Sequence, residues 1–281
     1  MAFGICVRRA EAHASAMAYA HAFSSLGCPE FTLEETLALA ERHRIDAIEL
    51  RALGGSMDLP AYLEKQYGTP AALAGKLRGS RVNILGLGTS LHVIGGQPGE
   101  REKFLEFVPW AEALGVRWLR IFDSDKALDA DEFAQAVGTM QWWRAQRAAA
   151  GWRTDVMVET HGGMTTTGTI QGFLAAVPGA AILWDTHHTW KKGGEDPLAT
   201  WRAIRASVVH VHVKDSISVP GARHPYTFVL PGEGEFPMAP LAAVLRDEFT
   251  GAVSLEWEKA WHPSLPSLDE ALRVAAARAW W

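Results

Sequence analysis

Ionisable side chains gather at the ends of four apolar segments in the second half of the chain. The first segment ends in VMVETHGG, which carries Glu159 and His161, and the second ends in ILWDTHHTW, which carries Asp185 and His188. The last two, VVHVHVKD and VSLEWEK, add His210, His212, Lys214, Asp215, Glu256 and Glu258. Burying ionisable groups is costly, so such a concentration indicates a site rather than packing.

Carboxylates buried together without matching basic residues would repel one another, and a divalent cation would remove that repulsion. One carboxylate from the first, second and fourth segments and one imidazole from the third would give four ligands. Three oxygens and one imidazole suit Mn²⁺, which we expect, or Mg²⁺, Co²⁺ or Zn²⁺. Residues two apart share a face of a strand, so alternation leaves open which member of each pair binds. Alternatively, each glutamate faces solvent, each histidine is a satisfied core residue, and Glu258 pairs with Lys259 or with arginines at the surface.

The segments that must position these groups alternate in type along the chain. Candidate strands are Met17–Phe23, Ala47–Leu53, Val82–Gly88, Val116–Asp123, Asp155–His161, Ala181–His187, Ser207–Asp215 and Ala252–Glu258. Candidate helices are Phe31–Arg44, Pro60–Gly79, Gly99–Leu114, Ala130–Ala150, Thr167–Val177, Pro197–Ala206, Met238–Phe249 and Ser267–Ala279. The strands are almost continuously apolar, which is typical of parallel sheets buried on both faces.

This pattern predicts an α/β protein with one domain, a (β/α)₈ TIM barrel over residues 17–281, preceded by an extension over residues 1–16. In such a barrel, the C-terminal ends of the strands form the active site. A doubly wound sheet is the rival fold, but the segment SSLGCPEF after the first strand lacks its Gly-rich phosphate turn. The Gly/Pro-rich segments 193–197 and 219–234 are candidate lids, and Trp280 and Trp281 are expected to dock on the barrel or at an interface.

Composition excludes several classes of protein. The net charge is −5, which does not favour holding a nucleic-acid backbone. Cys6 and Cys28 are the only cysteines, too few for a disulfide framework, which suits a reducing cytoplasm. No apolar run approaches the roughly 20 residues that span a bilayer. We therefore expect a cytoplasmic protein that binds neither nucleic acid nor membrane, and whether it forms a homo-oligomer stays open.

The motifs ETHGG, WDTHH, HVHVKD, GEGEFP and SLEWE, in this order, resemble the xylose-isomerase-like TIM-barrel superfamily. The resemblance extends from about residue 17 to the end of the chain. That superfamily contains sugar isomerases and epimerases, inosose dehydratase, hydroxypyruvate isomerase and endonuclease IV. The pattern is most similar to ketose 3-epimerases of the tagatose/psicose type.

The resemblance implies the roles of individual residues. It assigns the metal ligands as Glu159, Asp185, His212 and Glu256. The two glutamates would also be the catalytic acid/base pair, and His188 would bind substrate. Two positions depart from the epimerases. Ser218 replaces a substrate-binding Arg, for which Arg223 is a candidate substitute, and Thr165 replaces a carboxylate.

We therefore predict a metal-dependent isomerase or epimerase that removes an α-proton from a ketose or related keto-polyol through an enediolate. The alternatives are a metal-dependent dehydratase of a keto-inositol type of substrate and a non-catalytic sugar-binding or partner subunit. Candidate substrate-binding residues are His188, His161, Arg120, Trp190, Lys214 and Arg223.

Overall fold

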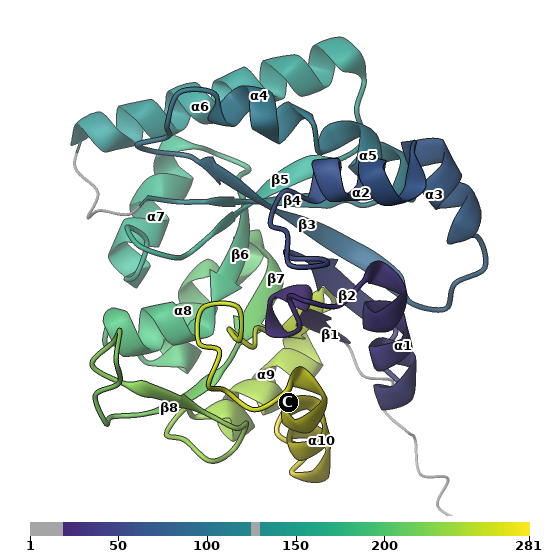
Figure 1. Cartoon of the computed structure of the whole chain (residues 1–281). Coiled ribbons are helices and arrows are strands. Elements are labelled where there is room, and N and C mark those ends of the chain that lie inside the picture. The colour runs from purple at the N-terminus through teal and green to yellow at the C-terminus, as the bar shows by residue number, and fades with distance from the viewer. Residues whose placement is uncertain (1–18, 125–129) are drawn as a thin grey trace, which may run out of the picture.

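Eight parallel strands close into a barrel in which every strand pairs with two neighbours. The computed structural model describes residues 19–124 and 130–281, and the barrel strands are β1 (Ala20–Ser24), β2 (Ala47–Leu50), β3 (Asn83–His92), β4 (Trp118–Phe122), β5 (Asp155–Glu159), β6 (Ala181–Asp185), β7 (Val208–Val213) and β10 (Ala252–Leu255). Their order around the ring is β1-β10-β7-β6-β5-β4-β3-β2, and β1 closes it by pairing with both β2 and β10. The predicted (β/α)₈ fold is confirmed (Figure 1). The proposed extension over residues 1–16 lies outside the described residues.

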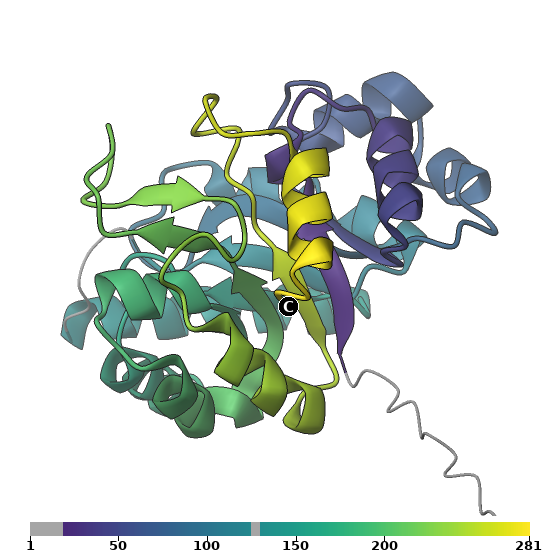
Figure 2. The same ribbon diagram turned by 90° about the horizontal axis from the view of Figure 1, so that it is seen from below.

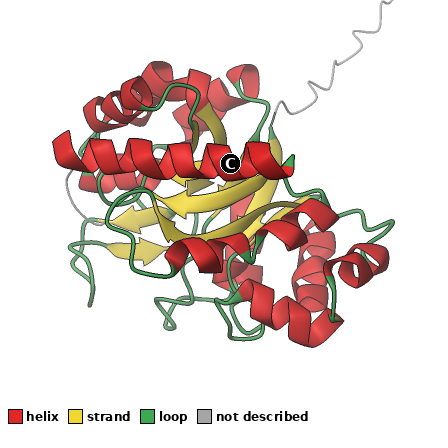
Figure 3. Ribbon diagram, turned by 90° about the horizontal axis from the view of Figure 1, so that it is seen from above, coloured by secondary structure: helices red, strands yellow, loops and turns green. Residues whose placement is uncertain are grey.

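Helices surround this ring on its outer side, as Figure 3 shows. They are α1 (Leu33–His43), α2 (Leu59–Tyr67), α3 (Pro70–Lys76), α4 (Glu100–Leu105), α5 (Val108–Leu114), α6 (Ala130–Ala150), α7 (Thr167–Ala176), α8 (Pro197–Ile204), α9 (Met238–Glu248) and α10 (Leu268–Ala277). The start of α1 has the reciprocal contacts of a capping box: Glu35 N–H donates to Thr32 Oγ1 and Thr32 N–H donates to a Glu35 carboxylate oxygen. None of the described helices is long and apolar enough to cross a membrane.

Two helices expected to be continuous are each divided in two. The segment predicted as one helix over residues 60–79 forms α2 and α3, because Gly68 takes a left-handed φ of 76° and Pro70 begins the next helix. The segment predicted over residues 99–114 forms α4 and α5. Pro109 lies in the first turn of α5, and its missing N–H prevents it from continuing a preceding helix.

A short hairpin follows β7, where a lid was expected over residues 219–234. Strand β8 (Asp215–Ile217) pairs antiparallel with β9 (Thr227–Val229), outside the ring (Figure 2). Asp215 also holds the chain beyond the hairpin, because its carboxylate accepts the backbone N–H groups of Gly232, Gly234 and Phe236 at 2.9–3.1 Å. A side-chain Cβ at Gly234 would lie 2.2 Å from Asp215 Oδ1. Part of the segment expected as a lid is therefore held in place, by the pairing of β9 with β8 and by the hydrogen bonds to Asp215.

Tryptophan contributes much of the packing between the barrel and its helices. Trp184 of β6 is fully buried and stacks on Trp201 of α8, with ring centroids 6.0 Å apart. Trp281 stacks on His21 of β1 at 5.1 Å, and Trp280 is also buried. The expected docking of the last two residues on the barrel is confirmed. In Figure 2, α10 lies beside α1, next to the strands at which the ring closes.

Candidate metal centre and active site

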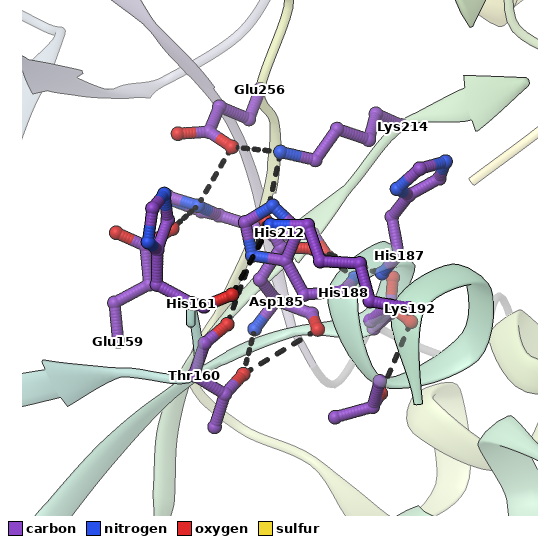
Figure 4. A network of polar contacts seen from close by, with 12 residues as sticks. Glu159, Thr160, His161, Asp185, His187, His188, Lys192, His212, Lys214 and Glu256 are labelled. Atoms are coloured by element: carbon purple, nitrogen blue, oxygen red, sulfur yellow. Dashed lines mark hydrogen bonds and ion pairs between the residues drawn. The ribbon is translucent and has the colours of Figure 1, made fainter. Parts of the chain in front are cut away.

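The predicted ligands come from four consecutive strands of the ring, β5, β6, β7 and β10, at or just beyond their C-terminal ends. One donor atom from each of Glu159, Asp185, His212 and Glu256 lies within 4.8 Å of the others, and all four side chains are buried. Register brings them together, because Asp185 pairs with His212 on the adjacent strand. A cavity of about 220 Å³ opens at this end and is lined in part by Glu159 and Glu256. Figure 4 shows the four side chains converging.

His212 is oriented by a carboxylate that the sequence analysis missed. Its Nε2 lies 2.9 Å from Glu49 Oε1 and 3.1 Å from Oε2, whereas its Nδ1 faces Glu159 and Glu256 at 3.5 and 3.4 Å. Glu49, in β2, also accepts from Ser254 Oγ at 3.2 Å. A carboxylate that accepts a hydrogen bond from Nε2–H leaves Nδ1 as the nitrogen available to a metal at the cluster, which is the usual support of a metal-binding histidine.

The donor set fits a divalent cation. Within the described residues, Glu159 Oε2, Asp185 Oδ2 and His212 Nδ1 have no partner with hydrogen-bond geometry, although each is buried. Asp185 Oδ2 and Glu159 Oε2 each have a basic side chain nearby, whereas His212 Nδ1 faces oxygens of Glu159 and Glu256. A cation bound among these buried atoms would satisfy all three. Three carboxylates and one imidazole are suitable ligands for the hard or borderline divalent metals.

Asp185 joins this cluster to the helix that follows it. Its Oδ1 accepts the backbone N–H groups of His187 and His188 at 2.9 and 3.0 Å, at the start of the short π-helix η2 (His188–Lys192). His188 Nδ1 lies 3.0 Å from the carbonyl oxygen of Thr160. A carbonyl only accepts, so Nδ1 carries the proton and Nε2 is left as an acceptor.

Buried basic residues accompany the carboxylates, which corrects an assumption made from the sequence. Lys214 Nζ lies 2.8 Å from Asp185 Oδ2 and 2.6 Å from Glu258 Oε1, and it also contacts Glu256. Arg120 Nε lies 3.3 Å from Glu159 Oε2. The carboxylates are thus partly neutralised by the chain itself. A metal would complete the neutralisation of the cluster rather than supply all of it.

These contacts shift the protonation equilibria in opposite directions. Burial, together with the charges of Glu256 and Glu159, raises the pKa of Asp185 to about 6 against the attraction of Lys214. Burial opposes ionisation of Glu256 too, but Lys214 and His212 outweigh it and hold the pKa of Glu256 well below its usual range. For Glu159, Arg120 and His212 together outweigh burial and the charge of Glu256, and they lower the pKa of Glu159. Both glutamates are therefore ionised at neutral pH, as bases must be.

A second group of residues, on the adjoining strands, makes the opposite wall of the cavity cationic. Arg51 follows β2 and Arg120 lies in β4, and both side chains are buried and line the cavity. Burial, together with the neighbouring charge of Arg120, lowers the pKa of Arg51 to about 9. Arg51 was not singled out from the sequence. Glu49 and Arg51 are two residues apart at the end of β2, like the paired ionisable residues on the other strands. This spacing, which places both on one face of a strand, could have indicated them from the sequence.

The six predicted substrate-binding residues divide into two sets. Those that line the cavity are Arg120, His161, His188 and Arg223. Lys214 is directed at the carboxylates instead, and Trp190 packs against His187 and Phe236. Ser218, where the epimerases have Arg, is held by Glu235, with its Oγ 2.6 Å from Oε2.

Comparisons with known proteins agree with this architecture. The profile of the family described as xylose isomerase-like TIM barrel matches residues 37–280. Among solved structures, the probable 3-DHS dehydratase AsbF from Bacillus anthracis aligns with a TM-score of 0.73 at 19% identity, covering 92% of this chain and 98% of its own. The IolI protein with a binding zinc atom aligns with a TM-score of 0.70 at 18% identity, covering 92% and 96%. An AP endonuclease, family 2, from Brucella melitensis gives 0.65 at 18% identity, covering 92% and 98%. A search of curated proteins gave no significant match.

Proposed function

Because the chain belongs to the xylose isomerase-like TIM-barrel family, we propose that it is a metal-dependent isomerase or epimerase of a ketose or related keto-polyol. The observation that supports this most directly is the convergence of Glu159, Asp185, His212 and Glu256 within 4.8 Å. Two of these ligands are carboxylates that border the cavity, where either could reach a substrate carbon. A structural neighbour gives further support, because the IolI protein was solved with a binding zinc atom.

We assign one divalent cation to these four residues and expect Mn²⁺, with Mg²⁺, Co²⁺ and Zn²⁺ as the other candidates. When bound, the cation would act as a Lewis acid for the carbonyl and adjacent hydroxyl oxygens of the substrate. The test is the metal content of purified protein, with Asp185→Asn compared with the exposed control Asp247→Asn. Equal metal content in wild type and Asp185→Asn would refute the ligand set.

Glu159 and Glu256 are the acid/base pair in this proposal. They come from strands that are separated by β6 and β7 in the ring, so they approach a bound substrate from different directions. One ionised carboxylate takes the α-proton, and the other, after taking up a proton from solvent, returns it to the carbon, which inverts the carbon if the two faces differ. Return of the proton to the neighbouring carbon would give isomerisation. The lowered pKa values of Glu159 and Glu256 suit either residue to the role of base.

The remaining residues would hold the substrate. His188 presents Nε2 as an acceptor for a substrate hydroxyl, because its Nδ1–H donates to the Thr160 carbonyl oxygen. His161 lines the same cavity, with its ring 4.9 Å from that of His188. Arg223 lies at the exposed rim and could contact the far end of a sugar.

A second candidate function, dehydration of a keto-inositol type of substrate, is favoured by Lys214. Its Nζ is 2.6 Å from Oε1 of Glu258, which lines the cavity. After α-proton removal, this pair could pass a proton to a leaving β-hydroxyl, which then departs as water. The likeness in fold to a probable dehydratase makes this reaction worth testing.

The decisive experiment is incubation of Mn²⁺-loaded protein with a panel of ketoses and keto-inositols in D₂O. Incorporation of deuterium at the α-carbon supports proton abstraction, and mass spectrometry separates epimers and isomers from products that have lost water. Glu256→Gln should abolish exchange, whereas the exposed control Glu64→Gln should not. Near-normal exchange by folded, metal-loaded Glu256→Gln would refute the two-carboxylate scheme. Sugar binding without exchange would instead indicate a non-catalytic binding subunit.

A further inference from the structure

Arg51 is a buried cation that lines the active-site cavity and has an unused hydrogen-bond donor. Its side chain is 8% exposed and lines the cavity. Nη2 donates to Ser90 Oγ at 3.2 Å, whereas Nη1 has no hydrogen-bond partner within the described residues. A buried donor left unpaired is costly, the more so when it is charged. Such a donor is expected where a ligand supplies the acceptor.

The strand between Arg51 and Arg120 has a glycine where both arginine side chains pack. A Cβ at Gly88 of β3 would lie 2.7 Å from Arg51 Cδ and 3.1 Å from Arg120 Nη2. The absence of a side chain therefore lets the two arginines pack across β3. Arg120 is already committed, with Nη1 donating to the Thr89 carbonyl oxygen and Nε beside Glu159. Arg51 differs in that its Nη1 has no hydrogen-bond partner within the described residues.

The two arginines and the proposed metal ligands come from different parts of the ring. Strands β5, β6, β7 and β10 carry the proposed ligands at or just beyond their ends, whereas Arg51 follows β2 and Arg120 lies in β4, beside Glu159. Lys192 also lines the cavity. Two neighbouring buried guanidinium groups repel each other, and a bound anion would offset this repulsion. Guanidinium groups bind carboxylate and phosphate oxygens with paired N–H donors.

We infer that the substrate is anionic, with a carboxylate or phosphate group bound by Arg51 at the end opposite the metal-binding portion. This inference rests on the proposed function for the hydroxy-ketone end of the substrate. The cavity of about 220 Å³ restricts the substrate to a compact molecule. Because Arg51 has an unpaired donor, a compact acidic keto-polyol fits this cavity better than a neutral sugar.

Binding of matched probes to metal-stripped protein tests this inference, because it removes the proposed metal chemistry from the measurement. D-gluconate and D-glucitol share a six-carbon chain and differ by the carboxylate, and D-glucose 6-phosphate and D-glucose differ by the phosphate. Isothermal titration calorimetry should show one anion binding about tenfold or more tightly than its neutral counterpart. The anion with the larger advantage identifies the group.

Arg51→Gln should abolish that advantage, Arg51→Lys should retain part of it, and the exposed control Arg81→Gln should leave it unchanged. The lysine variant keeps the charge, so it keeps the test valid if glutamine impairs folding. Equal binding of both members of each pair by wild type, or an undiminished advantage in Arg51→Gln, would overturn the inference. Failure of deuterium exchange alongside a persistent anion advantage would refute only the proposed reaction.

Discussion

Replacing Glu49 by glutamine would test whether the carboxylate that contacts His212 Nε2 orients this histidine in the proposed metal site. Glu49→Gln keeps the shape of the side chain but removes its charge and one oxygen acceptor. In the wild type, two oxygens of Glu49 lie 2.9 and 3.1 Å from His212 Nε2, and Oε2 lies 3.1 Å from His210 Nε2. The amide of glutamine can accept at one atom only, so the imidazoles lose support.

The expected effect follows from how metal-binding histidines respond to loss of such a partner. Removing it typically weakens metal affinity by about 10–100-fold, which corresponds to about 1.4–2.7 kcal/mol at 25 °C. The fold should weaken as well, because Glu49 is only 6% exposed and also accepts from Ser254. Loss of a buried acceptor costs about 1–3 kcal/mol of the free energy of unfolding.

The assay is competition between the protein and a fluorescent chelator for Mn²⁺, with thermal unfolding measured in parallel. The exposed Glu41→Gln variant changes the net charge by the same amount and should bind Mn²⁺ as the wild type does. Wild-type affinity in a folded Glu49→Gln variant would refute the orienting role. An equal loss in Glu41→Gln would attribute the effect to overall charge.

Three further predictions concern parts of the chain outside the metal cluster. Gly193→Ala should prevent stable folding, seen as insoluble or thermally labile protein, because its Cβ would lie 1.9 Å from the Thr165 carbonyl oxygen; a wild-type melting temperature would contradict the packing described. Burial raises the pKa of Cys28 to about 12, so in a variant lacking the other cysteine, alkylation of native protein by iodoacetamide should be negligible at pH 8 and rise only towards strongly alkaline pH; rapid labelling at pH 8 would show that the thiol is accessible. His43 lowers the pKa of Asp269 by hydrogen bonding, so Asp269→Asn should reduce the free energy of unfolding at neutral pH by up to about 1 kcal/mol, a loss that shrinks as acid protonates the wild-type carboxylate; a pH-independent difference would argue for another cause.

The order of strands and helices could be predicted because its physical signal is local. Apolar segments buried on both faces and capped amphipathic helices are visible in short windows, as at Thr32 and Glu35. The breaks within the helical regions were missed because the apolar spacing continues across Gly68 and Pro109. The β8–β9 hairpin was missed because three-residue strands carry almost no periodicity. Its position depends on Asp215 binding backbone groups that are distant in sequence.

The proposed ligands could be selected because strand ends meet at one end of a barrel whatever their distance in sequence. What surrounds them could not, because sequence spacing does not reveal which side chains share a wall of the barrel. Glu49 faces His212, which is 163 residues away, and this contact depends on closure of the ring. Lys214 was expected at the substrate, but alternation alone cannot tell a side chain that meets a ligand from one that neutralises its neighbours.

Closure of the ring also bears on synthesis of the protein. Ribosomes deliver a chain from its N-terminus, and local units can fold before the rest appears. Here Glu49 is made early, but its partners His212 and Ser254 lie 163 and 205 residues later. Strand β1 likewise cannot pair with β10 until β10 has been synthesised. The ring of strands that carries the proposed metal ligands therefore cannot be assembled until almost the whole described sequence has left the exit tunnel. Loading with metal would then be one of the last events of maturation, and a prematurely terminated chain would be distinguishable by its failure to retain the ion.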